Sequence, residues 1–218
     1  MTRSLDQKPV KTTHPQPENP WVELGKTLGT AFVLAILIRT FVAEARYIPS
    51  SSMENTLQIN DRLIINKFIY RFHDPKRGDI AVFMAPKSAG KACQKINTAP
   101  KDAYIKRVIG LPGDKVEVNT KHQVLINNQV LTEQYIKEPP DYSFDPIIVP
   151  PNSYLMLGDN RNNSCDGHLW GFLPRENFIG PAVFLFWPLN RLGVLDHQSG
   201  EQPSPTKDPS TNTVKSLK

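Results

Sequence analysis

The stretch YIKRVIGLPGD at residues 104–114 predicts the type of fold. It begins with a run rich in strand formers and ends in Pro112-Gly113, which suits the centre of a type II turn because glycine takes the positive φ angle. Asn127-Asn128 marks a tight hairpin in the same way. Six other short runs rich in strand formers are separated by turn signals: residues 63–65, 80–83, 115–118, 124–126, 154–157 and 182–187. Many short strands without alternating helices predict a mainly β fold of antiparallel sheets, forming a partly open barrel-like domain.

Composition narrows the class of protein. The chain has 218 residues with 20 prolines, and its net charge is +5. The proline content argues against a helical bundle, because proline removes a backbone donor and clashes with the preceding turn. No dense Lys/Arg block is present, so we expect no nucleic-acid partner. The mild positive excess suits contact with an anionic membrane surface.

An apolar segment precedes the strand-rich region. We expect residues 21–45 to be a single transmembrane anchor helix, with Lys26 and Arg39 reaching toward opposite interfaces and Trp21 as an interfacial anchor. Two alternatives are a buried core helix and a cleavable signal peptide ending in the A-x-A pattern at residues 43–45. A retained anchor is favoured because the region before the apolar run is long and carries acidic residues.

The rest of the chain divides around this segment. Residues 1–20 and 196–218 are polar, contain several prolines, and are expected to be disordered tails. Residues 46–195 are expected to form the β domain. The balance of Lys and Arg around the apolar run slightly favours a cytoplasmic N-terminus.

Two cysteines, Cys93 and Cys165, exclude a Cys-rich zinc module and a disulfide-dense mini-domain. A single bridge between them stays open, although separate thiols are favoured. Cys93 lies in the polar stretch 88–102, which we expect to be a surface loop.

Three segments contain candidate catalytic groups. Residues 48–53 (IPSSSM) place serines in a small-residue loop flanked by apolar side chains, and a serine nucleophile needs a nearby base. Lys106 lies inside an apolar strand, where lost hydration lowers the pKa of a lysine and lets it act as that base. Residues 158–168 (GDNRNNSCDGH) form a polar loop after a predicted strand, typical of a hydrogen-bond network. Taken singly, each segment also fits a linker, a surface lysine or a structured turn.

Taken together, these segments resemble bacterial type I signal peptidase, the membrane-bound leader peptidase of the Ser-Lys class. The resemblance covers most of residues 46–190. It is carried by PSSSMENTL at 49–57, RGDIAVF at 77–83, the stretch 104–114, and residues 158–166 followed by WGF at 170–172.

The resemblance implies roles by position. It implies that Ser52 is the nucleophile, Lys106 the general base, and Ser164 the residue that orients the Lys106 amine. The Ser52 N–H and the Ser50 hydroxyl would form the oxyanion hole. The resemblance also pairs Asp159 with Arg107 and Asp166 with Arg77. It implies shallow pockets that accept small residues and give an Ala-x-Ala preference, lined by Ile48, Met53, Leu57, Val82, Tyr104 and Ile105.

The sequence departs from the family pattern at several positions. Asn55 replaces a usual proline, Asn162 a common acidic residue, and Gly167-His168 a usual Ser-Arg pair. The last change removes one arm of the expected salt-bridge network. The additional β domain of some family members is expected to be reduced to about one hairpin, residues 115–135.

The resemblance predicts a membrane-bound serine endopeptidase that removes N-terminal signal peptides from exported preproteins through an acyl-enzyme. It implies no metal and no organic cofactor. The expected partners are preproteins, the phospholipid bilayer and the export machinery. The catalytic domain would lie on the trans side, in the periplasm or the thylakoid lumen. Two alternatives are a non-catalytic anchored β domain that binds signal peptides or other partners, and a self-cleaving repressor-like Ser-Lys protease. The latter would need a DNA-binding N-terminal domain that residues 1–46 cannot form.

Overall fold

The computed structural model of the chain describes residues 19–93 and 103–197. The chain divides into two compact units, residues 1–39 and 40–218. The expectations for the tails at 1–20 and 196–218 lie almost entirely outside the described residues, as does most of the expected loop at 88–102.

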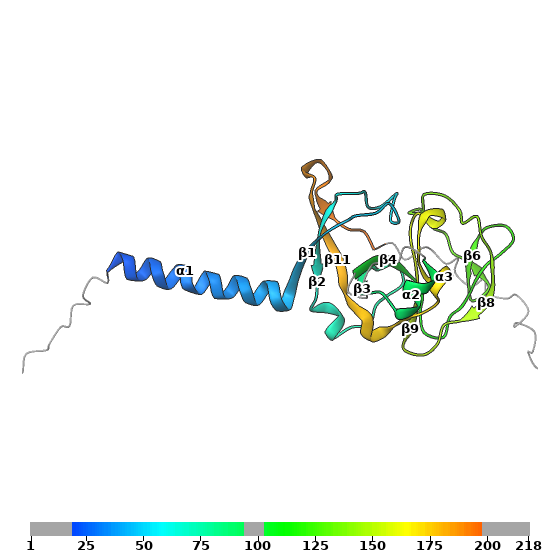
Figure 1. The fold of residues 1–218 in the computed structure, drawn as a ribbon, viewed down its shortest axis with the longest axis horizontal. Coiled ribbons are helices and arrows are strands. Elements are labelled where there is room, and N and C mark those ends of the chain that lie inside the picture. Colours follow the sequence, from blue (N-terminus) through cyan, green and yellow to red (C-terminus); the bar gives the residue numbers. More distant parts are fainter. Residues whose placement is uncertain (1–18, 94–102, 198–218) are drawn as a thin grey trace, which may run out of the picture. The chain divides into compact units, whose positions relative to one another are not determined.

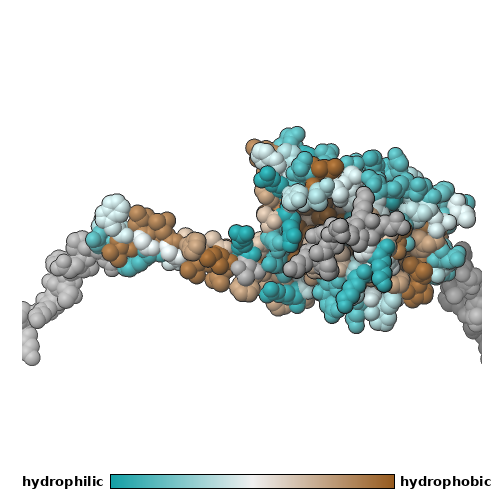
Figure 2. Space-filling model, viewed as in Figure 1, coloured by the Kyte–Doolittle hydropathy of each residue, from teal (hydrophilic) through white to brown (hydrophobic). Residues whose placement is uncertain are grey.

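The first unit contains one long helix, α1 (Pro20–Leu37). The Asn19 side chain accepts a hydrogen bond from the Trp21 backbone N–H at 3.0 Å, and Pro20 occupies the first helical position, where a missing N–H does no harm. The helix has no buried residues. Its apolar side chains are brown in Figure 2. By length and composition, α1 is sufficient to cross a membrane.

The helix is shorter than the sequence predicted. After α1 a π-helical turn covers Ile38–Val42, and residues 43–45 then belong to strand β1 (Ala43–Tyr47). This strand pairs antiparallel with β2 (Arg62–Asn66), with Ala45 opposite Ile64. The expected helix end at residue 45 is therefore wrong. Glu44 and Arg46 end the apolar run and form an ion pair at 2.6 Å on one face of the strand.

The second unit is mainly β and antiparallel, as predicted (Figure 1). Its larger sheet has the order β1-β2-β11-β3-β4-β9-β10, with β12 paired to β11, and a smaller sheet has the order β7-β6-β5-β8. The remaining strands are β3 (Ile80–Met84), β4 (Ala103–Gly110), β5 (Lys115–Val118), β6 (Val124–Ile126), β7 (Gln129–Val130), β8 (Phe144–Ile148), β9 (Ser153–Leu157), β10 (Leu173–Pro174), β11 (Phe178–Trp187) and β12 (Gly193–Val194).

The central strands are buried on both faces, which explains their uninterrupted apolar sequences. In β3, Ile80 and Val82 face one core cluster, while Ala81 and Phe83 face another. In β9 the residues likewise alternate between two clusters, with Leu155 and Leu157 in one and Tyr154 and Met156 in the other. Lys106 on β4 is therefore held in a strand that lies between buried neighbours.

The turn predictions hold, but the extension is larger than expected. Gly113 has a φ of 87°, and Asn127 and Asn128 have φ angles of 54° and 71° in a hairpin that pairs Ile126 with Gln129. The additional region is a four-stranded sheet, because β8 pairs with β5. The expected limit of about one hairpin, residues 115–135, is therefore wrong.

Short helices complete the unit: α2 (Lys87–Ala92), α3 (Gly167–Trp170), and 3-10 turns at Ile69–Arg71, Arg161–Asn163, Arg175–Asn177 and Leu189–Arg191. Cys93 directly follows α2, and Cys165 lies just before α3. The two cysteines form a disulfide with a Cα–Cα separation of 5.9 Å. The expectation of separate thiols is therefore wrong, because α2 and α3 lie beside each other against one apolar cluster.

Candidate active site

Two residues 54 positions apart in the sequence meet at the centre of the second unit. Ser52 lies in the turn region after β1, and Lys106 lies on β4 opposite Ala81 of β3. The distance between Lys106 Nζ and Ser52 Oγ is 2.6 Å. Ser52 is 7% exposed and Lys106 is 5% exposed. A hydroxyl and an amine in direct hydrogen-bond contact, largely shielded from water, are able to act as a nucleophile and its base.

Burial sets the charge of the amine. Loss of hydration lowers the pKa of Lys106 to about 8, because the buried charged form is disfavoured. The carboxylates of Asp166 and Asp159 oppose this shift and raise the pKa. A substantial fraction of Lys106 is therefore neutral at mildly alkaline pH and able to accept a proton.

Ser50 lies beside Ser52. The distance between Ser50 Oγ and Ser52 Oγ is 3.4 Å. A hydroxyl at this position can donate to an oxyanion formed at a carbonyl carbon that Ser52 attacks.

Ser164 is close to the pair but does not make the expected contact. Its hydroxyl is buried and, among the described residues, has no hydrogen-bond partner. The Lys106 amine hydrogen-bonds to Ser52. Ser164 packs on Gly158, where an added Cβ would clash with Ser164 Oγ and lie 2.5 Å from the Ser52 carbonyl oxygen. Gly158 is therefore the point at which residues 48–53, the serine loop, meet the 158–164 loop.

Two asparagines that sequence reasoning missed join these loops. The Asn160 backbone N–H donates to the Ser52 carbonyl at 3.1 Å, and its side-chain amide donates to the Ser51 carbonyl at 3.1 Å. The Asn163 amide donates to Ser51 Oγ at 2.8 Å. Asn and Asp in a loop after a strand were the available signal, but that pattern also fits an ordinary turn.

The expected pair of Arg107 and Asp159 is present. The guanidinium donates from Nε to Oδ1 at 2.8 Å and from Nη2 to Oδ2 at 2.7 Å. The two side chains are 1% and 0% exposed. Thr56 Oγ1 also donates to this carboxylate, and the guanidinium lies 3.9 Å from the centre of the Tyr135 ring. The bidentate pair ties β4 to the 158–164 loop.

The expected pair of Arg77 and Asp166 is wrong. Arg77 instead donates to Asp114 at 3.0 Å, in the turn that follows β4, and to the carbonyl of Ile109, near the end of β4. Asp166 accepts from the Gly158 N–H at 2.8 Å, and its other oxygen lies 2.7 Å from His168 Nδ1. Several carboxylates in the sequence were possible partners for Arg77, and the turn after β4 brings Asp114 to it.

The expected pocket residues are less accessible than predicted. Met53 and Leu57 are fully buried, and Ile48 and Val82 are at most 3% exposed, so all four belong to the core. Ile105 is half-buried against the same cluster, and Tyr104 is half-buried against another. Only these last two present surface that a bound peptide can contact directly.

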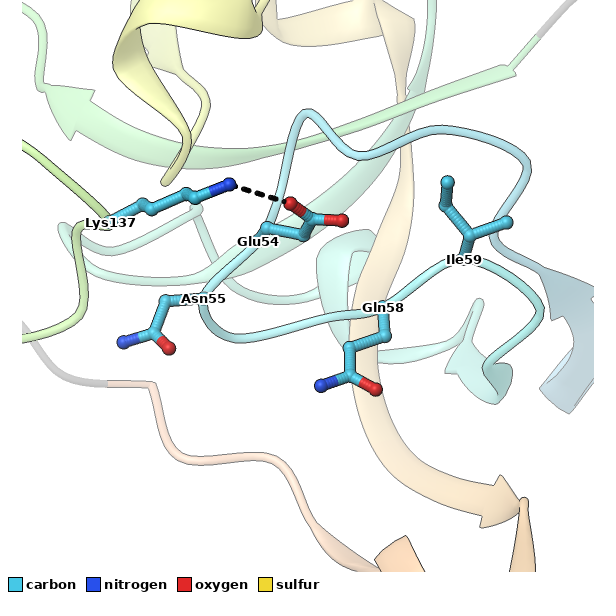
Figure 3. Close-up of a pocket in the computed structure, with 5 residues that line it drawn as sticks. All are labelled: Glu54, Asn55, Gln58, Ile59 and Lys137. Atoms are coloured by element: carbon cyan, nitrogen blue, oxygen red, sulfur yellow. Dashed lines mark hydrogen bonds and ion pairs between the residues drawn. The ribbon is translucent and has the colours of Figure 1, made fainter.

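A polar hollow lies next to the segment that follows Ser52 and is lined by Glu54, Asn55, Gln58, Ile59 and Lys137. Figure 3 shows Glu54 and Lys137 pointing toward each other, and their charged groups are 3.0 Å apart. It includes none of the expected pocket residues. Asn55, which replaces a usual proline, points its amide away from the ion pair in this view.

The other departures from the family pattern have structural partners. The Asn162 amide accepts from the Asp141 N–H at 2.8 Å and donates to the Pro139 carbonyl at 3.1 Å. A Cβ on Gly167 would lie 2.8 Å from the Met156 carbonyl oxygen, so the backbone there leaves no room for a side chain. His168 contacts the Asp166 carboxylate, so this carboxylate keeps a basic side chain as its partner.

Comparisons with known proteins identify the family of this chain. The model of the family "Signal peptidase, peptidase S26" matches residues 21–187. Probable signal peptidase I-2 of Synechocystis is 56% identical over 195 residues, which are 89% of this chain and 86% of that protein. Signal peptidase I of Leptolyngbya laminosa is 55% identical over 84% of this chain and 88% of its own length. Thylakoidal processing peptidase 1 of Arabidopsis thaliana is 38% identical over 78% of this chain and 49% of its own. The chain belongs to the signal peptidase family, peptidase S26.

Proposed function

We propose that this chain is a membrane-anchored serine endopeptidase that removes N-terminal signal peptides from exported preproteins. The observation that carries the proposal is the 2.6 Å contact between Lys106 Nζ and Ser52 Oγ, with both groups buried. The names of the relatives support the substrate class.

In the first step Ser52 Oγ attacks the carbonyl carbon of the last residue of the signal peptide, and neutral Lys106 takes the hydroxyl proton. The carbonyl oxygen becomes an oxyanion, which the Ser52 N–H and the Ser50 hydroxyl stabilise. Collapse of this intermediate breaks the C–N bond. Lys106 then gives its proton to the departing amine, and an acyl-enzyme remains.

Water completes the reaction. Lys106, neutral again, takes a proton from the water that attacks the ester carbonyl. Collapse of the second intermediate releases the signal peptide as a carboxylic acid and returns the proton to Ser52. These steps use only groups of the chain, the substrate and water.

The surrounding contacts hold the pair in position. Asn160 and Asn163 fix the backbone and the side chain of Ser51, the residue before the nucleophile. The Arg107–Asp159 pair fixes the strand that carries Lys106. We assign the lysine-orienting role to Ser164, whose buried hydroxyl has no hydrogen-bond partner among the described residues and packs against Gly158.

We assign small-residue specificity to the apolar set Ile48, Met53, Leu57, Val82, Tyr104 and Ile105. Because the first four are buried, they shape the floor of the site, while Tyr104 and Ile105 contact the substrate. A closely packed floor leaves no depth for a large side chain, which favours Ala-x-Ala sites. Arg77 and Asp166 support the fold around the site through Asp114 and His168.

The helix α1 is the retained anchor in this proposal. Cleavage after Ala45 would divide β1, which pairs with β2 along its whole length. The N-terminus would be cytoplasmic and the catalytic unit on the trans side, in the periplasm or the thylakoid lumen. Its partners would be preproteins, lipids of the bilayer and the export machinery.

The test is cleavage of a preprotein with an Ala-x-Ala site by the full chain in detergent micelles. Ser52→Ala should abolish cleavage, and Ser88→Ala, which alters an exposed serine on α2, should cleave like wild type. A substrate whose two alanines are replaced by leucine should resist the wild type. Cleavage by Ser52→Ala at the wild-type rate would refute the proposal.

A further inference from the structure

His168 contacts the buried carboxylate of Asp166, next to the active site. Asp166 is fully buried, and its Oδ1 lies 2.7 Å from His168 Nδ1 and accepts from the His168 backbone N–H at 3.2 Å. Its Oδ2 accepts from the Gly158 N–H at 2.8 Å. Asp166 thus joins His168 directly to the loop that packs against Ser52.

The imidazole is fixed in place but reaches solvent. Its ring stacks on Tyr142 with 4.1 Å between ring centres and 10° between planes. The side chain is 14% exposed, so a proton can exchange with water. The orientation is therefore set by two contacts, the Asp166 carboxylate and the Tyr142 ring.

Several other titratable and charged groups lie around the stacked Tyr142 ring. Burial and Asp166 raise the pKa of Tyr142 above its usual range, so this phenol stays neutral. Arg161 and Glu133 form a buried ion pair and compensate each other, and Asp141 is an exposed carboxylate. Histidine is the side chain that ordinarily gains its charge between about pH 5 and 8.

Asp166 is also electrostatically coupled to the base. Of the two carboxylates that raise the pKa of Lys106, Asp166 has the larger effect and Asp159 the smaller. The charge of Asp159 is compensated at every pH by the bidentate guanidinium of Arg107. The charge of Asp166 is compensated by His168, whose side chain carries a positive charge only when it is protonated.

We infer that His168 is a positioning residue that tunes Lys106 through Asp166 and keeps the Ser52–Lys106 pair active when the medium becomes acidic. This inference rests on the proposed function. When His168 is protonated, it neutralises Asp166, and the negative potential at Lys106 decreases. The ammonium form of Lys106 is then less stabilised, and Lys106 releases its proton more readily. At higher pH, where His168 is neutral, Lys106 releases its proton without this change in potential.

The test compares kcat/KM from pH 5.5 to 9.5 for wild type, His168→Gln and His168→Arg, using the full chain in micelles and one Ala-x-Ala peptide. Because the substrate is the same, its own titration cancels in the ratio between variants. His73→Gln, which alters an exposed histidine, is the matched control.

We expect wild type and His168→Gln to be equal near pH 9. Near pH 5.5 wild type should be at least about threefold more active, the effect of one added charge acting across a partly shielded distance. His168→Arg, which is charged at every pH, should match wild type in acid and reach half its maximal rate at a lower pH than His168→Gln.

Parallel profiles for the three proteins would overturn the inference. A uniform loss in His168→Gln at all pH values, with no change of profile in His168→Arg, would also overturn it, because it would mean that the ring only packs. The failure of the proposed function is a separate result, since it would appear as wild-type cleavage that does not depend on Ser52 at any pH.

Discussion

Lys106 Nζ lies 2.6 Å from Ser52 Oγ, although the two residues come from a strand and a turn that are 54 positions apart. The contact depends on the pairing of β4 with β3 and on the hydrogen bonds that join the serine loop to the 158–164 loop. A substitution that disturbs either set of contacts should lower catalytic activity more than it lowers the stability of the fold.

The buried lysine should reduce stability. The pKa of Lys106 falls from 10.5 to about 8 on folding, so between these pH values the unfolded chain holds a proton that the folded chain has released. The stability of the wild type should therefore rise with pH across this window. Lys106→Met should raise the unfolding free energy at pH 7 by up to about 3 kcal/mol while removing activity. The gain should vanish above about pH 10.5, which denaturant titration at pH 7 and 10.5 would measure.

Gly158 should tolerate no side chain. In Gly158→Ala the Cβ would lie 2.5 Å from the Ser52 carbonyl oxygen and would also meet Ser164 Oγ, so the two loops must separate. We expect kcat to fall at least about a hundredfold, because small misplacements of reacting groups reduce rates by this factor. Gly90→Ala, where a Cβ meets nothing within 4 Å, is the control. Wild-type kcat in Gly158→Ala would contradict the described packing of the two loops.

The buried ion pair should matter far more than an exposed one. Asp159→Asn leaves the Arg107 guanidinium buried without its counter-charge, and we expect a loss of about 3–5 kcal/mol in unfolding free energy. Asp74→Asn removes the partner of Arg175 where the aspartate side chain is 81% exposed, and the loss should be below about 1 kcal/mol. Equal losses for the two variants would show that burial does not govern the strength of the first pair.

The disulfide should stabilise the catalytic unit. It joins residues 72 positions apart and reduces the entropy of the unfolded chain, which corresponds to at most about 4 kcal/mol. Because Cys165 adjoins Ser164, loss of the disulfide should also loosen the 158–164 loop. We expect Cys93→Ser to lower Tm and kcat, and a reducing agent to have the same effect on wild type but none on Cys93→Ser. A reductant effect of equal size on both proteins would rule out this bridge as its cause.

Local sequence signals located the elements that are bounded by turns. The strands β5 and β6 were predicted with the residues they have, because Pro112-Gly113 and Asn127-Asn128 mark their ends. The strand β8 was missed because Pro146 interrupts it, and proline is tolerated there because β8 is at the edge of its sheet. The strand β1 was missed because its charged residues break the apolar pattern, and its pairing with β2 is a non-local contact.

The same distinction between local signals and non-local contacts applies to the site. Ser52 and Lys106 could be proposed from residue type and motif, but their contact depends on strand order, which local sequence does not encode. The partner of Arg77 depended on which carboxylate the turn after β4 presents, and the structure selects Asp114. The Cys93–Cys165 bridge depended on the approach of α2 to α3, two short helices without a strong pattern in the sequence.

The most direct test of the Ser52–Lys106 pair is the pH dependence of preprotein cleavage by wild type beside Lys106→Met. Wild-type kcat/KM should rise below pH 8, by up to about tenfold per pH unit, and level off above it, because the neutral form of Lys106 is required. Lys106→Met should lose at least about 10⁴-fold at pH 9, and Lys87→Met, an exposed lysine on α2, should lose nothing. A Lys106→Met enzyme that keeps wild-type activity, with the same rise toward pH 8, would contradict the assignment of Lys106 as the base.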